Sequence, residues 1–237
     1  MKTGNFAATR WTLVVQARGG DAAAQGALSE LCAAYYAPVV TFLRSEGREE
    51  DAARELAHEF FARVLAGGSL RGADPARGRF RSYLLGAVKH FLADLRDKAL
   101  AEKRGSGIAP VSMEDTASGF TVPAPEWPDS ERAFDRQWAL TIIARALAIV
   151  ETELRDAGKS AQFDVLKPWI TGESPAHSQS AAAEQLNMSE GAVKVAIHRL
   201  RQRFREAVKA EIAQTVPAES DVDDELRHLI AVLSAAA

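Results

Sequence analysis

The sequence predicts an all-α protein made of two small helical domains joined by a flexible linker. Apolar side chains recur three to four residues apart along most of the chain, which is the spacing of one face of an α-helix. Aromatic residues make up only 7% of the 237 residues, and alanine is abundant, which favours helix over sheet. The helical spacing disappears over residues 105–129, where four prolines and three glycines stand among small and polar residues. We therefore place a linker at 105–129, after a first domain at 1–104.

Four helices are expected in the first domain, each with its apolar residues on one stripe. In the fourth helix, Leu84, Val88 and Phe91 recur at this spacing. The second helix contains Pro38, which lacks a backbone N–H, so we expect a kink or an interruption there. A Gly-Gly pair ends the third helix, and a loop rich in Gly, Asp and Pro follows. The helices are expected at residues 11–17, 22–44, 49–65 and 80–100.

The second domain, residues 130–210, begins with a long helix and continues with shorter ones. Apolar stripes predict helices at 130–156 and 161–170. An acidic extension follows at residues 211–237, and its residues 221–233 have the pattern of an amphipathic helix. Because so short a helix is marginal alone, we expect it to pack against the second domain.

One segment of the second domain, SQSAAAEQLNMSEGAVKVAIHRLRQRFREAV, has the pattern of a helix-turn-helix. Ser178 or Ser180 is placed to cap a short helix at 181–186. Asn187 tolerates the left-handed conformation of a tight turn, and Ser189 is placed to cap a second helix. The apolar residues of that second helix recur at four, three and four residues, and these are Val193, Ile197, Leu200 and Phe204.

The polar residues of this second helix are the candidates for DNA contact. A helix held in this way presents its N-terminal polar side chains to the major groove, while arginines further along reach phosphates. The alternative is a helical hairpin with a basic, solvated face. The candidate residues are Ser189, Glu190, Lys194, His198, Arg199, Arg201 and Arg205.

The net charge of −3 conceals two basic segments. Residues 63–104 hold ten Lys and Arg against four Asp and Glu, and residues 194–209 hold six against one. Two basic segments separated by neutral sequence suggest two contacts with one polyanion, although either could be a solvated helix face.

Three stretches of the chain resemble one family, the extracytoplasmic-function (group IV) sigma factors of bacterial RNA polymerase. SEGAVKVAIHRLRQRFRE resembles the family's region-four recognition helix. EEDAARELAHEFFARVL resembles the region-two helix that docks on the polymerase clamp, and GRFRSYLLGAVKHFLADLRDK resembles the helix that melts the promoter. The pieces cover about residues 22–100 and 130–210, in the family's order. The resemblance implies a subunit that binds core RNA polymerase and directs promoter-specific transcription initiation.

The resemblance assigns residues of the first domain to two roles. Asp51, Glu55 and Glu59 recur every four residues as an acidic stripe and are the candidates for core polymerase binding, or else a solvated face. Cations and aromatic rings near the fourth helix suit single-stranded DNA, because bases stack on rings while phosphates seek guanidinium groups. Phe80 and Tyr83 are equally compatible with the core. The candidates for the downstream element and melting are Arg77, Arg79, Phe80, Arg81, Tyr83, Lys89, His90 and Arg96.

The expected partners are core RNA polymerase and promoter DNA, both duplex and single-stranded, with an anti-sigma factor as a further candidate. We expect a monomer when free, no enzymatic activity, and no cofactor or metal, since no nucleophile–base pair, phosphate-binding glycine loop or metal-ligand spacing is present. Residues 1–18 lack the apolar core of a signal peptide, no apolar run approaches the ~20 residues that span a bilayer, and Cys32 is the sole cysteine. A cytoplasmic location is therefore expected.

Two other functions fit the same pattern. One is a stand-alone helix-turn-helix regulator whose first domain senses a ligand and which binds palindromic operators as a dimer. The other is a helical adaptor that binds only proteins. The acidic extension also leaves two alternatives open: its acids weaken non-specific DNA binding, or the helix only completes the core of the second domain.

Overall fold

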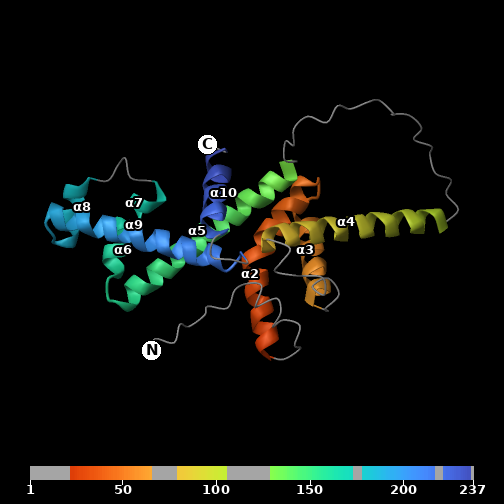
Figure 1. Cartoon of the computed structure of the whole chain (residues 1–237), viewed down its shortest axis with the longest axis horizontal. Coiled ribbons are helices and arrows are strands. Elements are labelled where there is room, and N and C mark those ends of the chain that lie inside the picture. The colour runs from red at the N-terminus through yellow and green to blue at the C-terminus, as the bar shows by residue number, and fades with distance from the viewer. Residues whose placement is uncertain (1–21, 66–78, 106–128, 173–177, 217–220, 236–237) are drawn as a thin grey trace. The chain divides into compact units, whose positions relative to one another are not determined.

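The computed structural model describes residues 22–65, 79–105, 129–172, 178–216 and 221–235 (Figure 1). All regular structure in these residues is helical, and no strand occurs among them, which confirms the all-α fold class. The helices are α2 (Ala22–Ser45), α3 (Glu50–Leu65), α4 (Phe80–Gly105), α5 (Asp129–Asp156), α6 (Ser160–Leu166), α7 (Pro168–Thr171), α8 (Gln179–Leu186), α9 (Glu190–Ala213) and α10 (Val222–Ser234).

Most helix boundaries agree with the prediction within a few residues, and two details differ. The helix expected at 161–170 is divided into α6 and α7, because Pro168 has no N–H to continue the first helix and instead starts the second. Pro38 does not interrupt α2, which runs through it. The helix expected at 11–17, the loop after α3 and residues 106–128 of the expected linker lie outside the described residues.

Backbone contacts divide the chain into two compact units, and the boundary falls inside α5, between Trp138 and Ala139. We call them the N-terminal unit, with α2, α3, α4 and α5 as far as Trp138, and the C-terminal unit, with the rest of α5 and α6 to α10. The second domain was predicted to begin at residue 130. Residues 130–138 therefore pack with the N-terminal unit.

Aromatic side chains fill the core of the N-terminal unit. The ring of Tyr35 in α2 meets that of Phe80 in α4 edge to face, with centroids 5.1 Å apart. Phe42 in α2 meets Phe134 in α5 at 6.5 Å, and Phe134 is fully buried. Edge-to-face pairs at these distances add to the stabilisation from apolar burial. The start of α5 is thus part of this core.

The C-terminal unit is built around α9. Val193, Ile197 and Leu200 on its first half are buried, as their spacing predicted. On its second half α9 packs against α10, where Val222 and Leu229 are buried. This contact confirms that the acidic extension packs against the second domain.

Candidate nucleic-acid interface

Two helices joined by a short turn, α8 and α9, form the centre of the candidate interface. Ser178 caps α8 through a hydrogen bond that its hydroxyl oxygen accepts from the Ala181 N–H at 2.9 Å. Ser189 caps α9 in the same way, accepting from the Ala192 N–H at 3.2 Å. Between them Asn187 has a φ of 51°, in the left-handed region that asparagine tolerates. Both caps and the turn residue were predicted, with Ser178 rather than Ser180 at the first cap.

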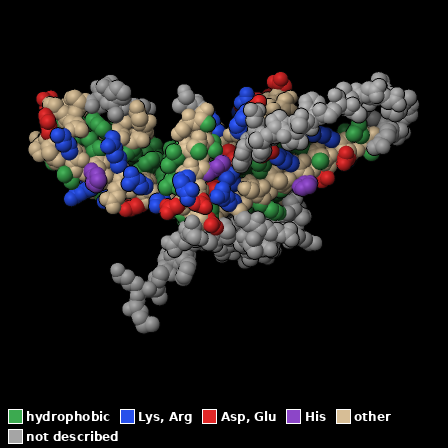
Figure 2. Space-filling model, turned by 45° about the horizontal axis from the view of Figure 1, so that its top comes forward, with side chains coloured by type: hydrophobic (Ala, Val, Ile, Leu, Met, Phe, Trp, Pro, Cys, Tyr) green, Lys and Arg blue, Asp and Glu red, His purple; other side chains and the backbone are tan. Residues whose placement is uncertain are grey.

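All seven DNA-contact candidates of α9 and its cap are exposed, and Figure 2 shows Lys and Arg side chains gathered over this part of the molecule. Lys194, His198 and Arg205 lie on one exposed stripe of α9, which begins at Glu190, one turn before Lys194. Arg201 lies beside them and donates a hydrogen bond from Nε to the Trp169 carbonyl oxygen at 3.2 Å. This stripe, together with Arg201, is the α9 basic face.

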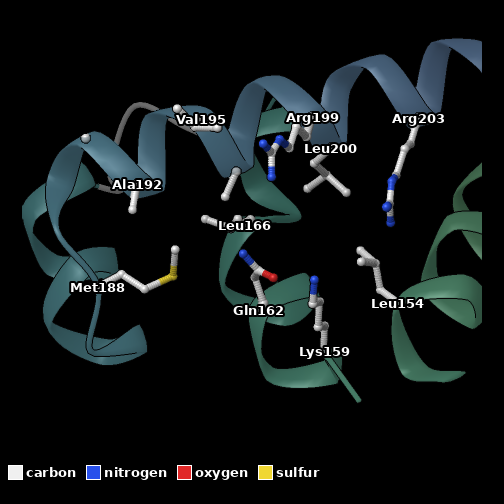
Figure 3. Close-up of a pocket in the computed structure, with 12 residues that line it drawn as sticks. Leu154, Lys159, Gln162, Leu166, Met188, Ala192, Val195, Arg199, Leu200 and Arg203 are labelled. Carbon is white, nitrogen blue, oxygen red and sulfur yellow. The ribbon is translucent and has the colours of Figure 1, made fainter. Parts of the chain in front are cut away.

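Arg199 lies on a different side of α9 from the basic face. With Arg203 it lines a groove between α9 and α6, where its guanidinium group reaches into the open space (Figure 3). Arg203 was not among the predicted residues, although its position four residues after Arg199 indicates a shared side of the helix.

The second group of candidates, on α4, is placed very differently from the first. Phe80 and Arg81 are only 2% and 4% exposed. Their predicted contact with a DNA strand is therefore wrong for this structure, because neither side chain reaches the surface. Arg79 and Tyr83 are half-buried, and Lys89, His90 and Arg96 are exposed. Arg77 lies outside the described residues.

Arg81 is held by a buried ion pair with the start of α5. Its Nη1 lies 2.6 Å from Oδ1 of Asp135, and both side chains are almost completely inaccessible. The guanidinium group also lies over the ring of Trp138, 5.3 Å from its centroid. Such a pair is costly to bury, and it is tolerated because the charge is paired and hydrogen-bonded.

Two further cations of α4 also contact carboxylates. Lys89 forms an ion pair with Glu131 of α5, and Arg96 lies 3.5 Å from Glu46 in the turn after α2. Neither these two carboxylates nor Asp135 were predicted as partners of α4. They are separated from α4 by 42 to 54 residues in the chain, so local spacing gives no sign of them.

The acidic stripe of α3 is present as predicted. Asp51, Glu55 and Glu59 are all exposed, and Glu59 pairs with Arg63 at 2.6 Å. Next to it, the Tyr36 hydroxyl and His58 Nε2 lie 3.0 Å apart, with their rings stacked. Glu59 is already paired with Arg63, whereas Asp51 and Glu55 form no ion pair among the described residues.

Comparisons with protein-family models, with curated proteins and with solved structures found no match. Within the described residues, no three His, Cys, Asp or Glu side chains come together as a metal site requires. None of the described helices is both long and apolar enough to cross a membrane.

Proposed function

We propose that this chain is a sigma subunit of bacterial RNA polymerase, of the extracytoplasmic-function type, which binds core polymerase and directs promoter-specific initiation. The observation that carries the proposal is the α8–α9 pair, with its two serine caps, its left-handed turn residue and its exposed basic face. In a helix-turn-helix, this face enters the major groove. Lys194 and His198, near the start of α9, would contact bases, and Arg205, three turns along, would contact phosphate.

The N-terminal unit supplies the two other activities that the proposal needs. The exposed stripe of Asp51, Glu55 and Glu59 suits a basic surface of core polymerase. The exposed side of α4, with His90, Lys89 and the half-buried Tyr83, suits a single strand of promoter DNA. Such a subunit acts in the cytoplasm as a non-catalytic protein that is monomeric when free, and an anti-sigma factor is a further candidate partner.

Transcription with core RNA polymerase tests the proposal. The purified chain is added to core polymerase on a library of genomic DNA fragments, and transcript 5′ ends are mapped. We expect initiation at a small set of sites that share sequence elements and that core polymerase alone does not use. Transcripts with the same ends in the presence and absence of the chain would contradict the proposal.

A charge-reversal pair tests the acidic stripe. Glu55→Lys with Glu59→Lys should weaken binding to core polymerase by about tenfold or more, roughly 1.4 kcal/mol, because attraction becomes repulsion. The matched control is Glu151→Lys with Glu153→Lys on α5, two acids of the C-terminal unit with the same change of charge. Equal affinities for the two variants would remove α3 from the polymerase interface.

A further inference from the structure

A groove between α6 and α9 has no part in the function proposed above, apart from the shared residue Arg199. We call it the α6–α9 groove, and its volume is about 560 Å³. Leu154, Leu166 and Leu200 form its floor and are buried, while Val195 on its wall is 49% exposed (Figure 3). This volume is in the usual range for small-molecule sites, about 300–1,000 Å³.

Three cations converge on this apolar floor. Lys159 reaches in from the turn before α6, and Arg199 and Arg203 reach in from α9 on the opposite side (Figure 3). No Asp or Glu lines the groove. Among the described residues none of the three cations forms an ion pair, although other cations of the same unit do, such as Arg145 with Glu211 and Lys209 with Asp223.

This combination of charges and apolar surface specifies the chemistry of a ligand. Three like charges facing one space repel one another, and an anion between them would relieve that repulsion. An exposed apolar side chain beside them gains from contact with an apolar group. A simple inorganic anion would neutralise the cations without covering the apolar side chains. A neutral apolar molecule would cover the apolar side chains without neutralising the cations.

We propose that the α6–α9 groove binds a small organic anion with an apolar body, of the medium-chain carboxylate class. Its carboxylate lies between Lys159 and the two arginines, and its chain covers Val195 and the leucine floor. Charge complementarity favours this occupant over a neutral ligand. The proposal does not depend on the proposed function, because it concerns neither DNA nor polymerase.

Calorimetric titration of the full chain with three probes tests the proposal. Decanoate carries both the chain and the charge, 1-decanol carries the chain alone, and acetate carries the charge alone. We expect saturable binding of one decanoate per chain, and at least tenfold weaker binding of the other two. Decanol binding as tightly as decanoate, or no saturable binding of decanoate, would overturn the proposal.

Variants then locate the bound decanoate. Lys159→Gln with Arg203→Gln should weaken decanoate at least tenfold, and Val195→Asp should weaken it by a similar factor, because it places a carboxylate at the wall. All three changed side chains are exposed, Lys159 in the turn before α6 and Val195 and Arg203 on α9. The fold should therefore persist, which circular dichroism checks. Arg155→Gln with Arg227→Gln is the control of equal charge outside the groove, and it should bind decanoate normally. Equal affinity for the groove variants and the control would assign the ligand to another place and overturn the proposal.

Discussion

The basic helices α4 and α9 differ in what their cations contact. On α4, Arg81, Lys89 and Arg96 each contact a carboxylate, supplied by α5 or by the turn after α2. On α9, Lys194 and Arg205 form no ion pair among the described residues, although Lys209 pairs with Asp223. The basic segments that contain α4 and α9 look alike in sequence, but these cations of α4 are paired with carboxylates and these cations of α9 are open to a phosphate.

This difference separates two stages of DNA binding in the proposed function. The α9 basic face can neutralise phosphates at once and release their counterions. On α4, phosphates must replace carboxylates before Lys89 or Arg96 can contact them, and Arg81 is too deeply buried to take part. The free chain should thus bind duplex DNA through its C-terminal unit.

The largest effect is expected from breaking the buried pair of α4. Asp135→Ala leaves the Arg81 guanidinium buried without its carboxylate, which should lower the free energy of unfolding by about 3–5 kcal/mol. Urea unfolding followed by circular dichroism measures the change. The control is Glu131→Gln, one turn earlier on α5, whose partner Lys89 is exposed and whose loss should cost no more than about 1 kcal/mol. If Asp135→Ala lowers the free energy of unfolding by less than about 1 kcal/mol, the Arg81–Asp135 pair does not stabilise the packing of the start of α5 in the N-terminal unit.

A smaller effect, on DNA binding and not on stability, is expected at the start of α9. Lys194→Ala should weaken binding to the preferred promoter by about 1–3 kcal/mol and relax the preference at one base pair, since a base contact is lost. Competition binding with single-base variants of the promoter measures both. Arg155→Ala, an exposed arginine of α5 paired with Glu151, should change neither. If Lys194→Ala behaves like this control, the residue does not read a base.

Further along α9 the expected effect is smaller and independent of sequence. Arg205→Ala should weaken binding to all duplexes alike and reduce the salt slope by roughly one, as the loss of one phosphate contact does. Measuring affinity across a series of salt concentrations gives the slope. An unchanged slope would place Arg205 outside the DNA contact.

The smallest effect concerns a cation of α9 that does have a partner. Lys209 Nζ lies 2.9 Å from Oδ1 of Asp223, and this hydrogen bond, reinforced by the charge of Lys209, lowers the pKa of the Asp223 carboxyl. Because the folded pKa is the lower one, the contribution of the pair to stability is present above the ordinary aspartate value of about 3.9 and is lost as the pH falls through the folded pKa. NMR titration of the carboxyl should show a pKa below the ordinary value, and Lys209→Gln should raise it. A titration that is the same with and without Lys209 would contradict the contact.

The helices could be predicted from the sequence because their signals are local. The apolar spacing of Val193, Ile197 and Leu200, and the serines before α8 and α9, depend only on residues within a few turns. The division at Pro168 could also have been predicted, since proline ends a helix at the residue before it.

The burial of Arg81 could not be derived from local spacing alone. Its partner Asp135 is 54 residues away, beyond residues that carry no helical pattern. One sign was present, because Arg81 lies within the arc of α4 that also holds Leu84 and Leu85, where an arginine needs a buried acid. Which cations of α4 and α9 are paired with carboxylates could therefore be determined only from the structure.

The most direct test of the proposed function is selection of randomised duplex DNA by the chain in complex with core polymerase, repeated with Lys194→Ala and with the chain alone. We expect the complex to select two separate elements, and Lys194→Ala to relax one position of the upstream element and leave the downstream element unchanged. Selection of one palindromic site by the chain alone, with no change when polymerase is added, would contradict the account and identify a stand-alone regulator.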